Sequence, residues 1–273
     1  MGLFSWLFRK KQPKKLKIGL ALGSGGAKGF AELGAVKALE ENGVEFDCFA
    51  GTSIGSIIGA FLANGYSSTD ILELLKGVNF SEIKNALMIN MDTAGMFSVI
   101  DKTIGSLNIE ELKKPFKCVA TDADSAEEYV FESGSVALAL SASSAYPPFF
   151  KPVVIENRRF VDGAFSNSVP ADLTREMGAD FVIGIDLSSH NPDKSFLMKI
   201  IPTFKGKVEK PWQKGYDNSN IMLHPNLLEY KPISFGAWHE IYDIGYQLAI
   251  EKMPEILQGI QQAKKELNKK TKK

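Results

Sequence analysis

Ser53 lies in the pentapeptide Gly51-Thr52-Ser53-Ile54-Gly55, which matches the pattern G-x-S-x-G. An apolar run at 46–50 precedes it and a Gly/Ala-rich segment at 54–63 follows it. A strand, a sharp turn and a helix would expose the Ser53 hydroxyl as a nucleophile, and glycine on both sides relieves crowding at such a turn. The alternative is a serine in an ordinary glycine-rich turn, because the pentapeptide alone arises often by chance.

A second glycine-rich segment, residues 23–29, follows the first apolar run and precedes a helical pattern. Lys28 occupies the position where G-x-G-x-x-G requires glycine, and no acidic residue ends the second strand, so a dinucleotide site is disfavoured. A P-loop is also disfavoured, since no Lys-Ser/Thr pair closes the segment. The remaining interpretation is an oxyanion hole built from the backbone N–H groups of Gly25 and Gly26.

A nucleophilic serine needs a base. The chain has three histidines, His190, His224 and His239. His190 follows a strand-like run at 181–187 and could reach the same sheet edge, but a histidine in a surface loop is the favoured interpretation. Asp162 ends the apolar run Phe160-Val161 and precedes Gly163, so it could activate Ser53 directly. Its alternative role is a β-turn residue, because Asp-Gly is a common turn pair.

The elements around these residues alternate between strand and helix patterns. We expect strands at 16–22, 46–50, 116–121 and 181–187, a short strand from 128, and a hairpin over 153–161. We expect helices at 30–39, 54–63, 69–76 and 170–177, loops and short helices over 77–110, a long loop over 190–220, and a helical region at 241–267 broken near Pro254. This order predicts an α/β fold with helices on both faces of a mostly parallel central sheet.

Charge is divided unevenly along the chain. Twelve of the 32 Lys and Arg residues lie in 1–17 and 264–273, whereas residues 18–263 carry 20 basic and 31 acidic residues, a net charge of −11. An acidic body with basic ends argues against a nucleic-acid enzyme and fits an anionic surface touched by the ends. Two cysteines, Cys48 and Cys118, are too few for a disulfide framework, and we expect buried thiols in a reducing compartment.

Two segments invite a membrane interpretation. Residues 1–8 are too short to span a bilayer, and Trp and Phe followed by Lys and Arg fit either an interfacial anchor or a frayed end. Residues 48–69 carry no charge, but four glycines and several hydroxyls dilute their hydrophobicity. For this second segment we expect a strand, a turn and a buried helix rather than a transmembrane helix.

Six blocks of this sequence resemble the patatin-like phospholipases, especially their compact bacterial members. The blocks, in the family's order, are GLALGSGGAKG at 19–29, GTSIG at 51–55, VATDAD at 119–124, SASSAYPPFF at 141–150, VDGAFSNSVP at 161–170 and MGADFVIGID at 177–186. The resemblance covers about residues 16–190. It implies a three-layer α/β/α fold and hydrolysis of lipid acyl esters by a Ser–Asp dyad.

Residue roles follow from the same resemblance. Ser53 would be the nucleophile and Asp162 the base, with Gly25 and Gly26 as the oxyanion hole. Supporting positions would be Lys28, Gly51, Gly55 and Gly163. Lys28 and Ser24 stand where the family commonly has Arg and Gly.

The resemblance also implies no cofactor and no metal in the reaction, a lipid or membrane-surface substrate, and no nucleic-acid partner. We expect a cytoplasmic location, with peripheral contact at the inner membrane surface through the basic termini. The expected organisation is a basic amphipathic segment (1–17), a catalytic core (18–190) and a flap with C-terminal helices and a basic tail (191–273). The alternatives are an acyltransferase acting on lipid acceptors and a non-catalytic lipid-binding or regulatory protein of the same fold.

Overall fold

The computed structural model describes residues 14–77, 94–190 and 210–271. Its strands are β1 (Ile18–Leu22), β2 (Cys48–Thr52), β3 (Phe116–Asp122), β4 (Glu128–Phe131), β5 (Val153–Ile155), β6 (Arg158–Asp162), β7 (Phe181–Ile185) and β8 (Ile221–Leu223). Its α-helices are α1 (Gly29–Glu41), α2 (Ile54–Ala63), α3 (Ser68–Gly77), α5 (Ala94–Ile104), α6 (Val136–Ser143), α7 (Ala171–Glu176), α9 (Gln213–Asn218) and α10 (Trp238–Thr271). Two short 3₁₀ turns matter for the site, η1 (Gly26–Lys28) and η3 (Gly163–Phe165).

All eight strands form one sheet with the order β5-β6-β3-β2-β1-β7-β8, and β4 pairs separately with β3. The pairs from β3 through β2, β1 and β7 to β8 are parallel. The pairs that involve β4, β5 and β6 are antiparallel. The prediction of a mostly parallel sheet is therefore confirmed, with an antiparallel extension beyond β3.

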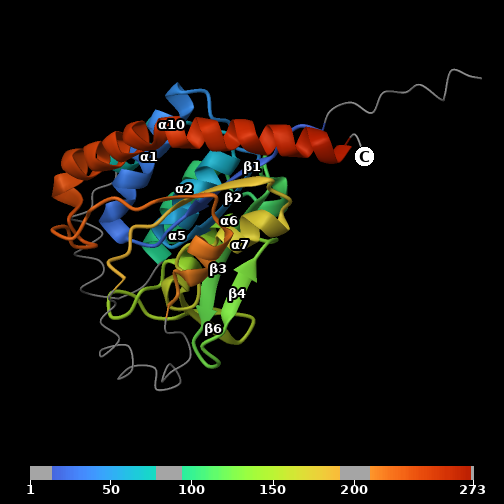
Figure 1. Ribbon diagram of the computed structural model, residues 1–273. Coiled ribbons are helices and arrows are strands. Elements are labelled where there is room, and N and C mark those ends of the chain that lie inside the picture. Colours follow the sequence, from blue (N-terminus) through green and yellow to red (C-terminus); the bar gives the residue numbers. More distant parts are fainter. Residues whose placement is uncertain (1–13, 78–93, 191–209, 272–273) are drawn as a thin grey trace, which may run out of the picture.

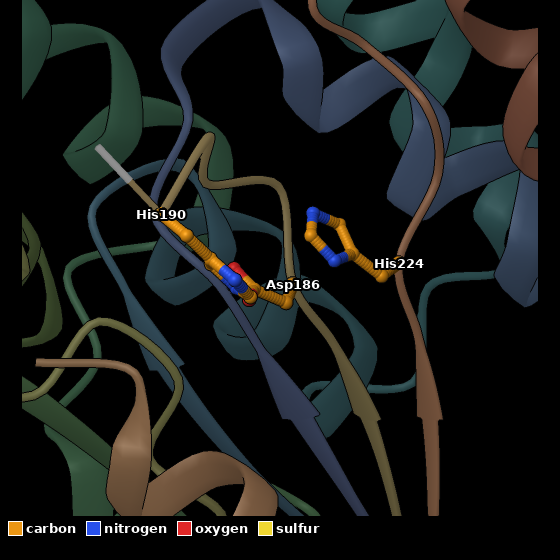
Figure 2. Close-up of side chains that lie close together, drawn as sticks. All are labelled: Asp186, His190 and His224. Carbon is orange, nitrogen blue, oxygen red and sulfur yellow. The ribbon is translucent and has the colours of Figure 1, made fainter. Parts of the chain in front are cut away.

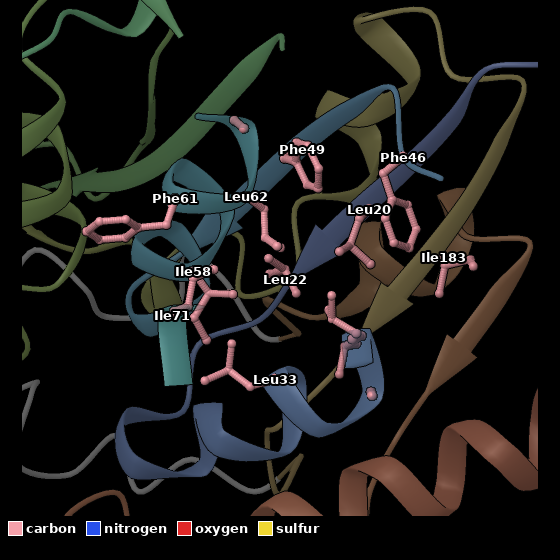
Figure 3. Close-up of a cluster of buried hydrophobic side chains, with 14 of the residues drawn as sticks. Leu20, Leu22, Leu33, Phe46, Phe49, Ile58, Phe61, Leu62, Ile71 and Ile183 are labelled. Atoms are coloured by element: carbon pink, nitrogen blue, oxygen red, sulfur yellow. The ribbon is translucent and has the colours of Figure 1, made fainter. Parts of the chain in front are cut away.

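Helices cover both faces of this sheet (Figure 1). The strands alternate accordingly: Leu20 and Leu22 of β1 face the layer of α1 and α2, whereas Ala21 packs in a cluster near α7. Figure 3 shows the larger cluster, in which Leu20 and Leu22 meet Leu33 of α1 and Ile58 of α2. The uncharged stretch 48–69 is accounted for by β2, α2 and the start of α3, as expected.

The long C-terminal helix α10 lies across α1 (Figure 1). Two glycines allow their backbones to approach closely, because a Cβ on Gly34 would lie 2.0 Å from the carbonyl oxygen of Tyr242 and one on Gly245 1.9 Å from that of Ala31. The expected break near Pro254 is wrong: α10 continues from Trp238 to Thr271. Buried Met253 and Ile256 flank the proline and hold both halves against the body, so packing outweighs the lost backbone hydrogen bond.

Other differences from the sequence expectations concern short or mixed elements. Helix α6 and strand β8 were not predicted, α9 lies inside the segment expected to be a loop, and α5 is an 11-residue helix within the segment expected to hold short helices. The strand expected at 46–50 is shifted by two residues, since β2 covers Cys48–Thr52. The hairpin over 153–161 is confirmed, with Glu156 and Asn157 in left-handed conformations at its turn. Cys48 and Cys118 are free and buried.

Candidate active site

Ser53 connects the end of β2 to the start of α2, in a backbone conformation that is unusual for a residue with a side chain (φ 56°, ψ −124°). Such a conformation costs on the order of 1–3 kcal/mol and persists where neighbouring contacts enforce it. Here the Ser53 N–H donates to the hydroxyl of Ser143 at 2.9 Å, and the Ser53 carbonyl accepts from the hydroxyl of Ser56 at 2.6 Å. The strand–turn–helix arrangement predicted around Ser53 is confirmed.

The glycines beside Ser53 permit close contacts between chain segments. A Cβ on Gly55 would lie 2.5 Å from the Leu22 carbonyl oxygen, so α2 begins directly against the end of β1. A Cβ on Gly51 would lie 2.3 Å from the carbonyl oxygen of Gly55. Glycine at both positions therefore brings the turn that carries Ser53 next to the loop that follows β1.

Asp162 reaches Ser53 from the other side of β3. Strands β2 and β6 lie on opposite sides of β3. Thr52, at the end of β2, pairs with Val119, and Asp162, at the end of β6, pairs with the next residue, Ala120. Ser53 follows Thr52, so it and Asp162 lie beside the same part of β3. Because β6 is antiparallel to β3, the end of β6 lies beside the turn after β2. A Cβ on Gly163 would lie 2.3 Å from the Val119 carbonyl oxygen, so glycine at this position allows the chain to cross β3 closely.

The Ser53 hydroxyl donates to the Oδ2 atom of Asp162 at 2.6 Å. The other carboxylate oxygen accepts from the Ala164 N–H at 2.9 Å, which fixes the orientation of the group. Asp162 is fully buried, and this burial raises its pKa from 3.8 to about 7, although the hydrogen bonds from Ser53 and Ala164 pull in the opposite direction. A carboxyl group with this pKa takes up and releases a proton readily near neutral pH.

In the glycine-rich loop after β1, some backbone N–H groups are hydrogen-bonded and others are not. The N–H groups of Gly23, Ser24 and Ala27 donate to the Glu32 side chain, the Ser168 carbonyl and the Pro232 carbonyl, respectively. Between them, the N–H groups of Gly25 and Gly26 have no hydrogen-bond partner among the described residues.

Unpaired N–H groups are uncommon in a packed segment, and these two would be available to a bound anion. Gly26 has a φ of +58°, and a Cβ there would lie 2.4 Å from the Pro232 carbonyl oxygen. The loop adjoins the serine turn, because a Cβ on Gly29 would lie 2.4 Å from the Ile54 side chain.

Lys28 ends η1 and is 8% exposed. Burial lowers its pKa, and the negative charge of Asp186 acts in the opposite direction. Its backbone N–H donates to the Gly25 carbonyl at 3.2 Å. Lys28 is thus a buried residue of the glycine-rich segment 23–29, and the supporting role expected for it stays a prediction.

In the part of the chain that the structure describes, none of the three histidines is hydrogen-bonded to Ser53 or Asp162. His190 does reach this edge of the sheet, but its Nε2 atom lies 2.6 Å from Asp186 Oδ2. His224 contacts Tyr216 and Ser188, and His239 stacks on Trp238. Within the described part of the chain, the group paired with the Ser53 hydroxyl is the carboxylate of Asp162.

Two residues of this site were not found from the sequence. Ser143 was part of the SASS segment, but nothing in the sequence indicated that α6 would bring it to the Ser53 backbone. Glu32 was overlooked as well; the available signal was an acid among the apolar positions of its helix, and the structure shows it fully buried. Burial raises its pKa well above the ordinary value.

The model of the patatin-like phospholipase family matches residues 20–175, more than half of the 273-residue chain. The chain belongs to the patatin-like phospholipase family. The matched range includes Ser53, Asp162 and the glycine-rich loop. The narrower expectation of a compact bacterial family member stays a prediction.

Relatives from animals and fungi extend this assignment. The chain is 31% identical over 275 residues to human patatin-like phospholipase domain-containing protein 6, covering 84% of this chain and 20% of that protein. It is 32% identical over 267 residues to lysophospholipase nte1 of Aspergillus fumigatus, covering 84% of this chain and 18% of that protein. The chain therefore spans about a fifth of the length of these relatives.

Among solved structures, VipD of Legionella pneumophila has a similar fold. The TM-score is 0.53 at 16% sequence identity, covering 89% of this chain and 67% of that one. This likeness agrees with the three-layer α/β architecture of the patatin-like family. No helix within the described residues is long and apolar enough to cross a bilayer.

Proposed function

We propose that this chain hydrolyses acyl ester bonds of phospholipids and lysophospholipids, with Ser53 as nucleophile and Asp162 as general base. The observation that carries the proposal is the 2.6 Å hydrogen bond from the Ser53 hydroxyl to the fully buried Asp162 carboxylate. The substrate class is supported by family membership and by the lysophospholipase name of the fungal relative.

In the first step, the Ser53 Oγ atom attacks the ester carbonyl carbon while its proton moves to Asp162 Oδ2. The carbonyl oxygen becomes an oxyanion, and the N–H groups of Gly25 and Gly26 would donate hydrogen bonds to it. The lack of partners for these two groups among the described residues supports this role. Collapse of the tetrahedral intermediate breaks the bond to the alcohol, which takes the proton back from Asp162.

In the second step, water attacks the acyl–Ser53 ester. Asp162 accepts a proton from this water, and the second tetrahedral intermediate collapses to release the fatty acid and return the proton to Ser53 Oγ. A pKa of about 7 suits Asp162 to both directions of transfer, because the ionised and protonated forms are both accessible near neutral pH. The reaction slows below this pH, since the protonated carboxyl cannot accept the serine proton.

The test is a panel of phospholipids, lysophospholipids and neutral acylglycerols, with products identified by mass spectrometry for the wild type and Ser53→Ala. We expect free fatty acid from the phospholipid classes with the wild type and none with Ser53→Ala. Transfer of the acyl chain to an added lipid alcohol, in place of fatty acid release, would identify an acyltransferase. Binding of the same lipids without turnover would identify a non-catalytic member of the family.

A further inference from the structure

The ends of β7 and β8 bring together two side chains of types that commonly bind metals, and the described residues show no hydrogen bond from either to Ser53 or Asp162. Ile185 and Leu223 are paired in the parallel ladder, and each is followed by a polar residue, Asp186 and His224. The Asp186 N–H donates to the Leu223 carbonyl at 2.9 Å, so the ladder continues to this point. Residues at matching positions of neighbouring parallel strands project to the same face of the sheet. Figure 2 shows both side chains at the strand ends.

His190 joins them from the segment after β7. Its ring stacks on Trp212, with centroids 4.7 Å apart and planes inclined by 7°, and its Nε2 atom lies 2.6 Å from Asp186 Oδ2. One ligand atom from each of Asp186, His190 and His224 lies within 4.8 Å of the others (Figure 2). Each side chain is held in place by a contact outside the cluster.

The hydrogen bonds of His224 leave one ring nitrogen with a lone pair, which an ion would take over from a hydroxyl partner. Its Nε2 atom lies 2.9 Å from the Ser188 carbonyl, which can only accept, so in the neutral ring Nε2 carries the proton. The Nδ1 atom then keeps its lone pair and faces the hydroxyl of Tyr216 at 3.1 Å. A backbone carbonyl that holds the outer N–H of a histidine is a recurrent feature of metal sites, because it fixes the tautomer and the ring orientation.

The charge around Asp186 also favours a cation. The Asp186 side chain is 1% exposed. Its Oδ1 atom accepts from the Ser188 N–H at 2.9 Å, and its Oδ2 atom lies 2.6 Å from His190 Nε2. Lys28 interacts electrostatically with Asp186, but no hydrogen bond joins the two among the described residues. A buried carboxylate is costly unless a positive charge or several donors compensate it. A divalent cation would take the place of the His190 donor and neutralise the carboxylate charge directly.

An ion can reach this cluster from solvent. His224 is exposed, and it lines a cavity of about 320 Å³ together with Lys28, Ser188 and Asn226. The cavity adjoins the glycine-rich loop, since a Cβ on Gly25 would lie 2.8 Å from the Leu187 side chain. The cluster is therefore accessible to solvent at His224, whereas Asp186 is buried at the edge of the sheet.

We propose that Asp186, His190 and His224 form a binding site for a divalent transition metal ion of the zinc class. Two imidazole nitrogens and one carboxylate oxygen suit Zn²⁺ better than Mg²⁺ or Ca²⁺, which prefer oxygen ligands. Metal–ligand bonds of about 2.1 Å in a tetrahedral site place ligand atoms about 3.4 Å apart. This spacing lies between the 2.6 Å and 4.8 Å of the cluster, so small side-chain movements complete the site.

The ion would replace the hydrogen bond between His190 and Asp186. In a neutral ring the proton moves from His190 Nε2 to Nδ1, and the Nε2 lone pair then binds the metal. A protonated ring instead releases its Nε2 proton to solvent and keeps the proton on Nδ1. The fourth position would face the Tyr216 hydroxyl or water. The site lies outside the acyl-transfer steps, and its direct effect would be to join the ends of β7 and β8 to the segment that carries His190.

The experiment is calorimetric titration of the chelator-treated full chain with Zn²⁺, repeated with Co²⁺ because its visible absorption reports coordination. We expect one ion per chain. His190→Gln and His224→Gln should each weaken Zn²⁺ binding by at least about 100-fold, since loss of an outer partner alone weakens metal sites by about 10–100-fold. Glutamine keeps the size and polarity of each side chain, and thermal unfolding without metal verifies folding.

The matched control is His239→Gln, a histidine that stacks on Trp238 outside the cluster. It should bind Zn²⁺ as the wild type does. Absence of Zn²⁺ binding by the wild type, or equal affinity of the wild type, His190→Gln and His224→Gln, would overturn the proposal. Fluorophosphonate labelling of Ser53 is measured separately on the same samples, so failure of the metal site and failure of the proposed hydrolase activity are distinguishable.

Discussion

The carboxyl group of Glu32, fully buried in α1, accepts a hydrogen bond from the backbone N–H of Gly23 at 2.6 Å. This contact ties the first helix to the start of the loop that carries Gly25 and Gly26. The loop has few other internal bonds, so its shape depends on such outside contacts. Glu32 is thus a positioning residue for the proposed oxyanion hole.

Replacement of Glu32 tests this role. Glu32→Leu leaves the Gly23 N–H buried without an acceptor and should lower the free energy of unfolding by about 1–3 kcal/mol. It should also lower kcat more than it raises KM, because the loop acts in the transition state. Glu32→Gln keeps an acceptor oxygen and should retain both properties. Ester kinetics and thermal unfolding of the two variants provide the comparison, and equal loss in both would refute the positioning role.

Gly26 offers a test of the loop itself with a matched control elsewhere in the chain. Gly26→Ala introduces a Cβ 2.4 Å from the Pro232 carbonyl oxygen and should displace the loop, lowering kcat by about 10²-fold, the scale of one lost oxyanion donor. Gly43 has a similar positive φ of +73°, but nothing lies within 4 Å of a Cβ there. Gly43→Ala should lower stability by about 1 kcal/mol and leave kcat unchanged. Similar kcat losses in the two variants would argue against a catalytic role for this loop.

The raised pKa of Asp162 predicts a pH-dependent gain in stability for Asp162→Asn. Since the folded pKa of about 7 exceeds the ordinary 3.8, the folded protein binds more protons than the unfolded chain between these values, and stability falls as pH rises through that range. Removing the group should raise the free energy of unfolding by up to about 4 kcal/mol at pH 8. At pH 5 this gain should be smaller by about 3 kcal/mol. Denaturant unfolding of both proteins at the two pH values measures the difference. A gain that does not change with pH would mean that Asp162 ionises normally.

The two catalytic candidates were predictable from the sequence, but their surroundings were not. G-x-S-x-G between a strand and a helix indicated Ser53, and the DG pair after an apolar run indicated Asp162. Periodicity did not show that β6 runs antiparallel to β3, which is what brings Asp162 to Ser53 across one strand.

The same limit explains the remaining misses. Ser143 contacts Ser53, 90 positions earlier in the chain, and Glu32 contacts Gly23, 9 positions earlier. Both contacts depend on tertiary packing. Strand β8 has three residues, too few for a pattern, and the continuity of α10 through Pro254 reflects packing against the body. Local sequence rules describe isolated segments and do not include such contacts.

The basic N-terminal segment leads to a membrane prediction. Residues 1–13 lie outside the described residues, whereas Lys14 and Lys15 pair with Asp180 and Asp47 on the body. Each Lys or Arg near an anionic lipid surface contributes about 1 kcal/mol to binding, and the apolar side chains of this segment would add burial in the interface. Deletion of residues 1–13 should weaken co-sedimentation with anionic vesicles and leave hydrolysis of a short soluble ester unchanged. Equal co-sedimentation of both forms would show that this segment does not contribute to membrane binding.

The most direct test of the proposed dyad is the rate of fluorophosphonate labelling, with the modified residue located by peptide mass spectrometry. The account predicts labelling at Ser53 in the wild type, at a rate that rises with pH around a midpoint of about 7 as Asp162 ionises. Asp162→Asn should slow labelling by at least about 10²-fold, the scale of a lost general base. Ser53→Ala should abolish it without loss of folding. Labelling of another residue, or an unchanged rate in Asp162→Asn, would contradict the assignment of Ser53 and Asp162 as the catalytic pair.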